Sequence, residues 1–353
     1  MNADRSRALA KRGLGRRAVL AGAAGAALAG AAPAFAQAQF RGRELVSSSF
    51  GGPGMEILQR VVFDPFDRET GARSTQVPLL SAQAFARMRA EKDRPEIDMF
   101  MFSGGQEVTA KAEGLTQPIA GVARMSEVPA QLRDPDGHWL VWGVIAEGIL
   151  YRTDKMREAP TSYRDFFRPE LAGHVAFPHI TNGYGMDFLV MLARLEGGGE
   201  RAIDPGFEAM KRLRGATIFR APSDVQTLFS QGDIWIMPYD AATAVRTARM
   251  NLPVAFVTPR EGAPAVFLTA CIAKNTRNAD MSAAVIDRML SAESQVAVAR
   301  EVVWGPSNTT VQLPPDVAST VARPDQLAVL DRDTINAKRS EWTERWNREI
   351  AGG

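Results

Sequence analysis

The chain has 353 residues, with 42 basic and 40 acidic side chains and 45% hydrophobic content. Six of the basic residues and one acidic residue fall in the first 36 positions, so the remainder holds 36 basic and 39 acidic side chains, a net charge of −3. This balance excludes the basic surface that binds nucleic acids or anionic membranes, and a chain of this length favours two lobes over a single core.

The N-terminal segment has the order of an export signal. Basic residues that include Arg16 and Arg17 precede an uncharged run over 18–32, and a small-x-small cleavage site ends at Ala36. The paired arginines are typical of twin-arginine export. The uncharged run is too short to span about 30 Å of hydrocarbon. We therefore predict a signal peptide over 1–36, cleaved after Ala36, and a periplasmic location.

After this segment, strand and helix patterns alternate along the chain. Apolar spacing over 55–70 predicts a helix that is interrupted at Pro65 and ends at Gly71. Neighbouring apolar runs predict strands at 44–46, 74–77 and 97–102 and helices over 82–92 and 108–113. This alternation is typical of an α/β domain built on a parallel sheet.

A second α/β set follows a long extended stretch over 139–151. This stretch is longer than an ordinary strand and is expected to cross between lobes, and the apolar run over 265–272 is the expected return crossing. The other predicted elements are strands at 175–177 and 234–237 and helices over 186–195, 207–213, 225–230, 241–250, 280–290 and 327–350. On the last helix, Trp342 and Trp346 lie one turn apart and are expected to pack in the core.

Ligand contacts are expected in the loops between the lobes, because ligands of open α/β sheets bind at the carboxyl ends of strands. Tyr239 and Asp240, for example, follow the strand predicted at 234–237. For Trp142 and Phe267, packing within the hinge remains an open alternative. The candidate ligand-binding residues are Ser49, Phe50, Ser103, Trp142, Asn182, Tyr184, Tyr239, Asp240, Phe267 and Trp304.

The sequence has no strong pattern for catalysis or metal binding. The three histidines, His138, His174 and His179, have no adjoining carboxylates or cysteines, which is a poor pattern for a metal site. The Gly-x-Ser-x-Gly motif of hydrolases does not occur. The single cysteine, Cys271, lies in an apolar run and is expected to be a buried, inert thiol. We therefore predict that the protein is not an enzyme and has no metal site or cofactor.

Several short motifs occur in the order of a known family. The sequence D-P-F-D-R-E-T-G at 64–71 and the sequence E-G-I-L-Y-R-T-D-K at 147–155 are two of them. Further matching segments lie at 110–119, 160–166, 259–263, 272–275 and 290–295. Together these segments resemble the extracellular solute-binding proteins of family 1. Within that family, the chain resembles most the spermidine/putrescine-type substrate-binding proteins of ABC transporters.

The resemblance implies a type II periplasmic-binding-protein fold, in which crossing hinge strands join two α/β lobes. Lobe one would hold 40–143 and 270–305, and lobe two would hold 144–265 and 306–353. The implied function is that of the periplasmic binding component of an ABC importer, a monomer that closes on a small-molecule ligand. Its partners would be permease subunits in the inner membrane. A periplasmic ligand carrier for a chemoreceptor would share the fold and remains an alternative.

The class of ligand is less clearly indicated. Asp240 is the one clear acidic candidate, which favours a small amine-bearing or zwitterionic solute, polyamine-like in character. The serine-rich first loop, Asn182 and Arg220 favour instead an organic acid, a phosphonate or an opine-like anion. Iron-binding relatives use a pair of tyrosines, and the four tyrosines of this chain include no adjacent pair, which argues against ferric iron.

Overall fold

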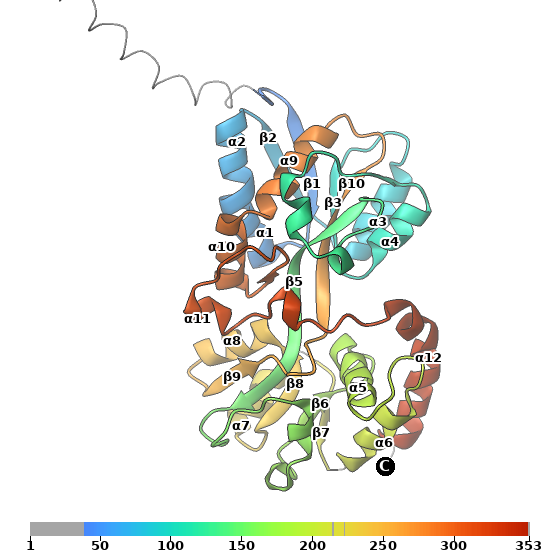
Figure 1. The fold of residues 1–353 in the computed structure, drawn as a ribbon, viewed down its shortest axis with the longest axis vertical. Helices are drawn as coiled ribbons and strands as arrows, with labels where there is room; N and C mark the ends of the chain where they lie inside the picture. The colour runs from blue at the N-terminus through green and yellow to red at the C-terminus, as the bar shows by residue number, and fades with distance from the viewer. Residues whose placement is uncertain (1–38, 214, 222, 352–353) are drawn as a thin grey trace, which may run out of the picture.

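Two lobes, one above the other, make up the part of the chain that this computed structural model describes, residues 39–351 without 214 and 222 (Figure 1). The predicted two-lobed α/β fold is confirmed. No helix among the described residues is long and apolar enough to cross a membrane. The signal peptide predicted over 1–36 lies outside these residues.

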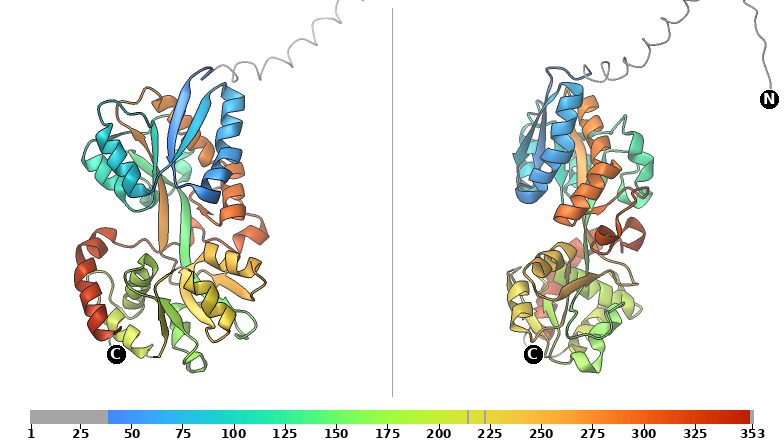
Figure 2. Two further views of the ribbon diagram at one scale, coloured as in Figure 1. Left: turned by 180° about the vertical axis from the view of Figure 1, so that it is seen from behind. Right: turned by 90° about the vertical axis from the view of Figure 1, so that its left-hand side faces the viewer.

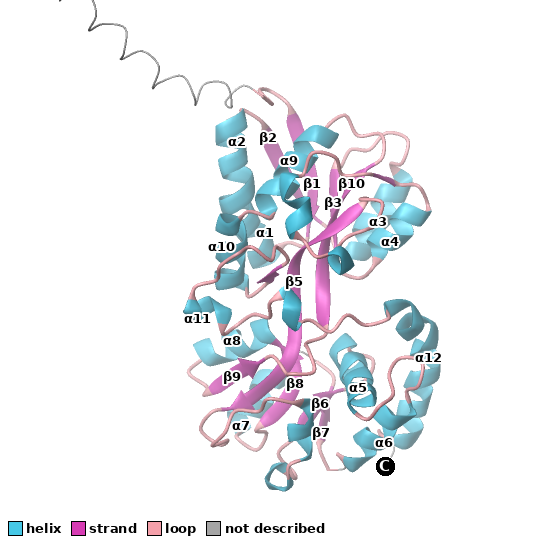
Figure 3. Ribbon diagram, viewed as in Figure 1, coloured by secondary structure: helices cyan, strands magenta, loops and turns pink. Residues whose placement is uncertain are grey.

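Lobe one is built on a mixed sheet with helices on either side of its strands (Figure 3). Its strands lie in the order β2, β1, β3, β10 (Ala265–Ala273), β5 (Trp139–Arg152), in which β1 pairs in parallel with both β2 and β3. Its strands are β1 (Glu44–Ser49), β2 (Arg73–Pro78), β3 (Met99–Phe102) and β4 (Thr116–Gln117). Its helices are α1 (Gly52–Leu58), α2 (Asp64–Thr70), α3 (Ser81–Ala90), α4 (Gln106–Ala112), α9 (Ala279–Met289) and α10 (Ala292–Val302).

The helix predicted over 55–70 is interrupted, and Pro65 accounts for the interruption. A π-helical turn, Gln59–Phe63, separates α1 from α2, and Pro65 lies in the first turn of α2. Because proline has no N–H to donate, the wider turn before it avoids a broken hydrogen bond within a regular helix. Gly71 ends α2 in the left-handed conformation, with φ 74°, as the sequence predicted.

Lobe two repeats the α/β pattern. Its strands are β6 (Ala176–Pro178), β7 (Thr217–Phe219), β8 (Ile236–Asp240) and β9 (Val254–Val257). Its helices are α5 (Gly183–Leu195), α6 (Asp204–Arg212), α7 (Asp224–Gln231), α8 (Ala241–Arg249) and α12 (Arg332–Glu349). Trp342 and Trp346 of α12 are buried in the core of this lobe, as predicted.

The last helix is shorter than the sequence suggested. It begins at Arg332 instead of 327, because residues before it bond to another part of the chain. The backbone of Ala263 bonds to Gln326 and Ala328 on either side of Leu327. The side chain of Asp331 then caps α12 by accepting from the N–H of Thr334 at 3.0 Å.

Two long strands cross between the lobes, and both views of Figure 2 show them. Strand β5 (Trp139–Arg152) pairs with β10 (Ala265–Ala273) in lobe one and with β8 and β9 in lobe two. The two predicted crossings are therefore confirmed. A short strand, β11 (Gly305–Pro306), pairs with β5 at the same level, and a short helix, α11 (Pro315–Ala318), follows it. The exact residue boundaries of the lobes stay a prediction.

Candidate functional site

A cleft of about 490 Å³ opens where the two lobes meet. Ile145 of β5 and Val266 of β10 form its floor, and Trp304 reaches it from lobe one. Lobe two contributes the remaining lining residues, Asn182, Gly183, Tyr184, Tyr239, Asp240, Ala242, Thr243 and Arg246. The cleft therefore has one apolar and aromatic side and one polar side.

The structure brings half of the candidate ligand-binding residues together in this cleft. The five that line it are Asn182, Tyr184, Tyr239, Asp240 and Trp304. Two more stand behind the Trp304 indole, since Phe50 and Trp142 make edge-on ring contacts with it at centroid distances of 6.4 and 5.7 Å. Trp142 is fully buried, so its role in this structure is packing within the hinge.

The other three candidates do not line the cleft. Ser49 is buried at the end of β1, and Phe267 packs half-buried against the core of lobe one. The hydroxyl of Ser103 pairs with that of Ser81 at 3.1 Å. Of the candidates at strand ends, Asp240 of lobe two thus lines the cleft, and Ser49 and Ser103 of lobe one do not.

Helix α5 and strand β8 position the aromatic residues of the polar side. Asn182 caps α5, and its side-chain oxygen accepts from the N–H of Tyr184 at 3.1 Å. The rings of Tyr184 and Tyr239 meet edge-on with centroids 4.5 Å apart. Tyr184 therefore lies within the first turn of α5, which begins at Gly183, three residues before the start that the sequence predicted.

Asp240 is the last residue of β8 and also the cap of α8. Its carboxylate accepts from the backbone N–H and from the hydroxyl of Thr243, each at 2.8 Å. The hydroxyl of Thr243 in turn accepts from the guanidinium of Arg246 at 2.6 Å. Burial, followed by the nearby negative charge of Asp240, raises the pKa of Tyr184.

Sequence reasoning missed Thr243 and Arg246. Both lie on α8 at intervals of three residues from Asp240, so they share the face that the cap presents to the cleft. An aspartate followed three residues later by a threonine at a helix start is a recognisable capping pattern, so the sequence held a usable signal. Among the described residues, no carboxylate lies within ion-pair distance of the exposed Arg246 guanidinium.

A buried charge network lies next to the cleft. Glu147 lies opposite Asp240 in the pairing of β5 with β8 and close to Asp187 of α5. Arg332 binds both carboxylate oxygens of Asp187, at 2.5 and 2.8 Å, and the carbonyl of Ala265 at 3.1 Å. Burial, and then the charge of Asp187, raise the pKa of Glu147 well above its usual range. This favours the neutral acid at Glu147.

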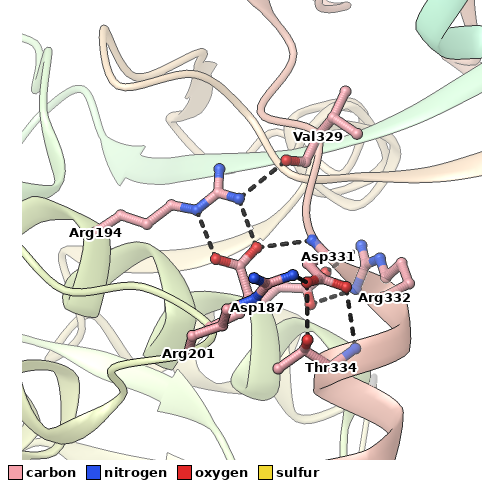
Figure 4. A network of polar contacts seen from close by, with 8 residues as sticks. Asp187, Arg194, Arg201, Val329, Asp331, Arg332 and Thr334 are labelled. Carbon is pink, nitrogen blue, oxygen red and sulfur yellow. Dashed lines mark hydrogen bonds and ion pairs between the residues drawn. The ribbon is translucent and has the colours of Figure 1, made fainter.

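Figure 4 shows how the network continues along the segment that precedes α12. The guanidinium of Arg194 pairs with Glu200 and donates to the carbonyl of Val329 at 3.0 Å. Glu200 accepts from the N–H of Asp331 at 2.8 Å. Arg194 and Glu200 of lobe two thus hold the segment before α12 and the start of that helix in place. Asp187 is used in this network and is only 2% exposed, so it does not reach the cleft.

A family model for bacterial extracellular solute-binding proteins matches residues 94–338, more than half of the chain. The chain belongs to this family. It is therefore a bacterial extracellular solute-binding protein. The narrower likeness to spermidine/putrescine-type proteins stays a prediction.

Individual relatives are distant in sequence and similar in fold. An uncharacterised protein of Haemophilus influenzae is 24% identical over 325 residues, which cover 83% of this chain and 88% of that protein. An extracellular solute-binding protein from Bordetella parapertussis has a TM-score of 0.80 at 21% identity and covers 88% of this chain and 99% of its own. A Bordetella ferric binding protein has a TM-score of 0.72 at 19% identity and covers 86% and 98%. These structures share the fold with this chain.

Proposed function

We propose that this solute-binding protein captures a small zwitterionic organic solute between its lobes and delivers it to an ABC permease in the inner membrane. One observation carries the proposal: the cleft presents one cation, Arg246, and one carboxylate, Asp240, which share the hydroxyl of Thr243. A ligand with an acid group and an amino group would find a partner for each. The aromatic rings of Trp304 and Tyr184 would cover the part of the ligand that carries the positive charge.

The charge of the cleft argues against a longer polyamine. A polyamine needs a carboxylate near each of its amino groups, and Asp240 is the one acidic residue in the lining. The next acid, Glu147, is buried and is not among the lining residues, and its raised pKa favours the uncharged form. Arg246 would also repel a ligand that carries only positive charge. The zwitterion is therefore the part of the sequence-based prediction that the cleft supports best.

Hinge closure would couple binding to transport. A ligand that contacts Trp304 and the lobe-two residues together does so only when the lobes approach each other. Binding then favours the closed form by the difference in affinity between the two forms. The crossing strands β5 and β10 are the elements about which the lobes would turn. Because no bond is made or broken, this function needs no catalytic residue.

One observation favours ferric iron as a second candidate ligand. Tyr184 and Tyr239 are far apart in the sequence, yet their rings meet in the cleft beside Asp240. Phenolate and carboxylate oxygens together can hold a ferric ion. However, burial raises the pKa of both tyrosines, which disfavours the phenolate. Ferric iron therefore ranks below the zwitterion.

Thermal unfolding of the mature chain, residues 37–353, tests the ligand class. The panel is a set of amino acids, betaines, opines, organic acids, diamines and ferric citrate. A ligand at a hundred times its dissociation constant adds about 2.7 kcal/mol and raises the unfolding midpoint. We expect zwitterions to give the largest shift. Shifts from diamines or from organic acids alone would contradict the proposal, and so would a visible absorption band with ferric citrate.

Variants of helix α8 assign the contacts. Arg246→Gln should abolish the shift by removing the partner of the acid group, and Asp240→Asn should weaken it while keeping a good helix cap. Arg249→Gln is the matched control, because Arg249 lies one turn further along α8 and outside the cleft lining. If Arg249→Gln weakened binding as much as Arg246→Gln, the guanidinium would not be a specific contact.

A further inference from the structure

Trp304 enters the cleft from a residue with an unfavourable backbone conformation. Val303, at the end of α10, has φ 61°, in the left-handed region. Glycine usually occupies this position after a helix, and a β-branched side chain is an outlier there. The other non-glycine residues with positive φ among those described, Asn251 and Asn275, are of a type that tolerates this region.

Packing of the Val303 side chain offsets this unfavourable conformation. Val303 is 4% exposed and lies in a cluster with Ala299 of its own helix. The same cluster contains Ala241 and Ala242, the first two residues of α8, directly after Asp240. The buried side chain of Val303 thus fixes the turn that leads to Trp304. It also packs in the same cluster as the start of α8, the helix that carries the polar side of the cleft.

The indole of Trp304 occupies a space that a glycine leaves open. A β-carbon at Gly54 of α1 would lie 2.1 Å from Cη2 of the Trp304 ring, which is not possible without movement of the ring. Phe50 and Trp142 contact the indole from two further directions. These three neighbours all belong to lobe one, so the ring is held by its own lobe and is linked to lobe two through Val303.

From these contacts we propose that Val303 and Gly54 are positioning residues, which hold the Trp304 indole in the cleft before a ligand enters. The inference rests on the proposed function in one respect, that the indole forms the lobe-one side of the ligand site. The lobe-one side is then preformed. Less ordering is needed when the ligand binds, and a preformed contact favours tighter binding.

Fluorine NMR of the ligand-free mature chain labelled with 5-fluorotryptophan tests the positioning directly. Trp304→Phe assigns the Trp304 resonance. We expect Gly54→Ala to shift this resonance, because the ring must move. We also expect Val303→Gly to broaden it, because glycine without the buried side chain lets the turn sample several conformations. Val303→Ile keeps the branched, buried side chain and should leave the resonance sharp.

The signals of Trp342 and Trp346, in the core of lobe two, are internal controls and should not change. A double-mutant cycle separates displacement of the ring from general damage: Gly54→Ala should lower the unfolding midpoint in the wild type and much less in the Trp304→Ala background. An unchanged Trp304 resonance in both Gly54→Ala and Val303→Gly would overturn the inference. Because the NMR samples contain no ligand, that result would not contradict the proposed function. Equally, the absence of any thermal shift with the ligand panel would not contradict the NMR result.

Discussion

The two sides of the cleft are held in place by different means. In lobe one, Trp304 is fixed by shape: rings of Phe50 and Trp142 contact it, and Gly54 leaves room for it. In lobe two, Asp240 and its neighbours are fixed by hydrogen bonds from capping groups. The first side should therefore respond to changes in side-chain volume, and the second to loss of a polar partner.

A network of charged side chains also supports the polar side of the cleft. This network consists of Glu147, Asp187 and Arg332. Helix α5 carries both Asp187 and the cap at Asn182. A change in this network should therefore reach the cleft through α5. Changes in lobe one reach the cleft through direct contact with the Trp304 ring.

The largest effect is expected for Arg332→Met. The substitution keeps the volume but leaves Asp187, which is 2% exposed, beside Glu147 without a cation. Removing one partner of a buried pair costs 3–5 kcal/mol, and we expect about 2–4 kcal/mol of unfolding free energy because the guanidinium is partly hydrated. Urea denaturation measures the loss.

Arg201→Met is the control within the same network. Arg201 faces Asp331 at 3.6 Å, and its side chain is 87% exposed, so water screens that pair. We expect a much smaller loss than for Arg332→Met. Equal losses for the two variants would show that the buried carboxyl pair is not what makes lobe two depend on Arg332.

Glu147→Gln should change how stability depends on pH. The raised pKa means that folded Glu147 keeps a proton which the unfolded chain releases, so stability is lost as the pH rises through the folded pKa. One retained proton gives a slope of up to about 1.4 kcal/mol per pH unit. Glutamine imitates the neutral acid, so the variant should be more stable than the wild type on the alkaline side of this window.

Thermal midpoints measured from acid to alkaline pH check this expectation. Glu44→Gln provides the control, since it removes the same charge from an exposed residue at the start of β1. If the thermal midpoints of Glu147→Gln and of the wild type changed in parallel at every pH, folded Glu147 would not retain the extra proton.

Local patterns made much of the fold predictable. The strand and helix alternation and the length of β5 depend on neighbouring residues, and the structure agrees with both. The end of the last helix was predictable, but its start at Arg332 was not, because the preceding residues bond to Ala263. That contact joins segments more than sixty residues apart, so no local pattern indicates it.

The same distinction applies to the candidate site. Asp240 was identified because it follows a predicted strand, and Asn182 because it precedes a predicted helix; both line the cleft. The approach of Tyr184 to Tyr239 could not be predicted, because α5 and β8 bring together residues that are distant in the sequence. The role of Gly54 was likewise hidden, since it depends on the ring of Trp304 at the other end of the chain.

The smallest expected effect distinguishes the two sides most sharply. Thr243→Val keeps the shape of the side chain and removes the hydroxyl that Asp240 and Arg246 share. Asp240 retains the bond from the backbone N–H of residue 243, so we expect a loss of about 1 kcal/mol of unfolding free energy. Thr247→Val, one turn along the same helix, removes only a bond to a backbone carbonyl and should be nearly neutral. If Thr243→Val were also neutral and still bound the panel ligand as the wild type does, the polar side of the cleft would be fixed by shape, as Trp304 is.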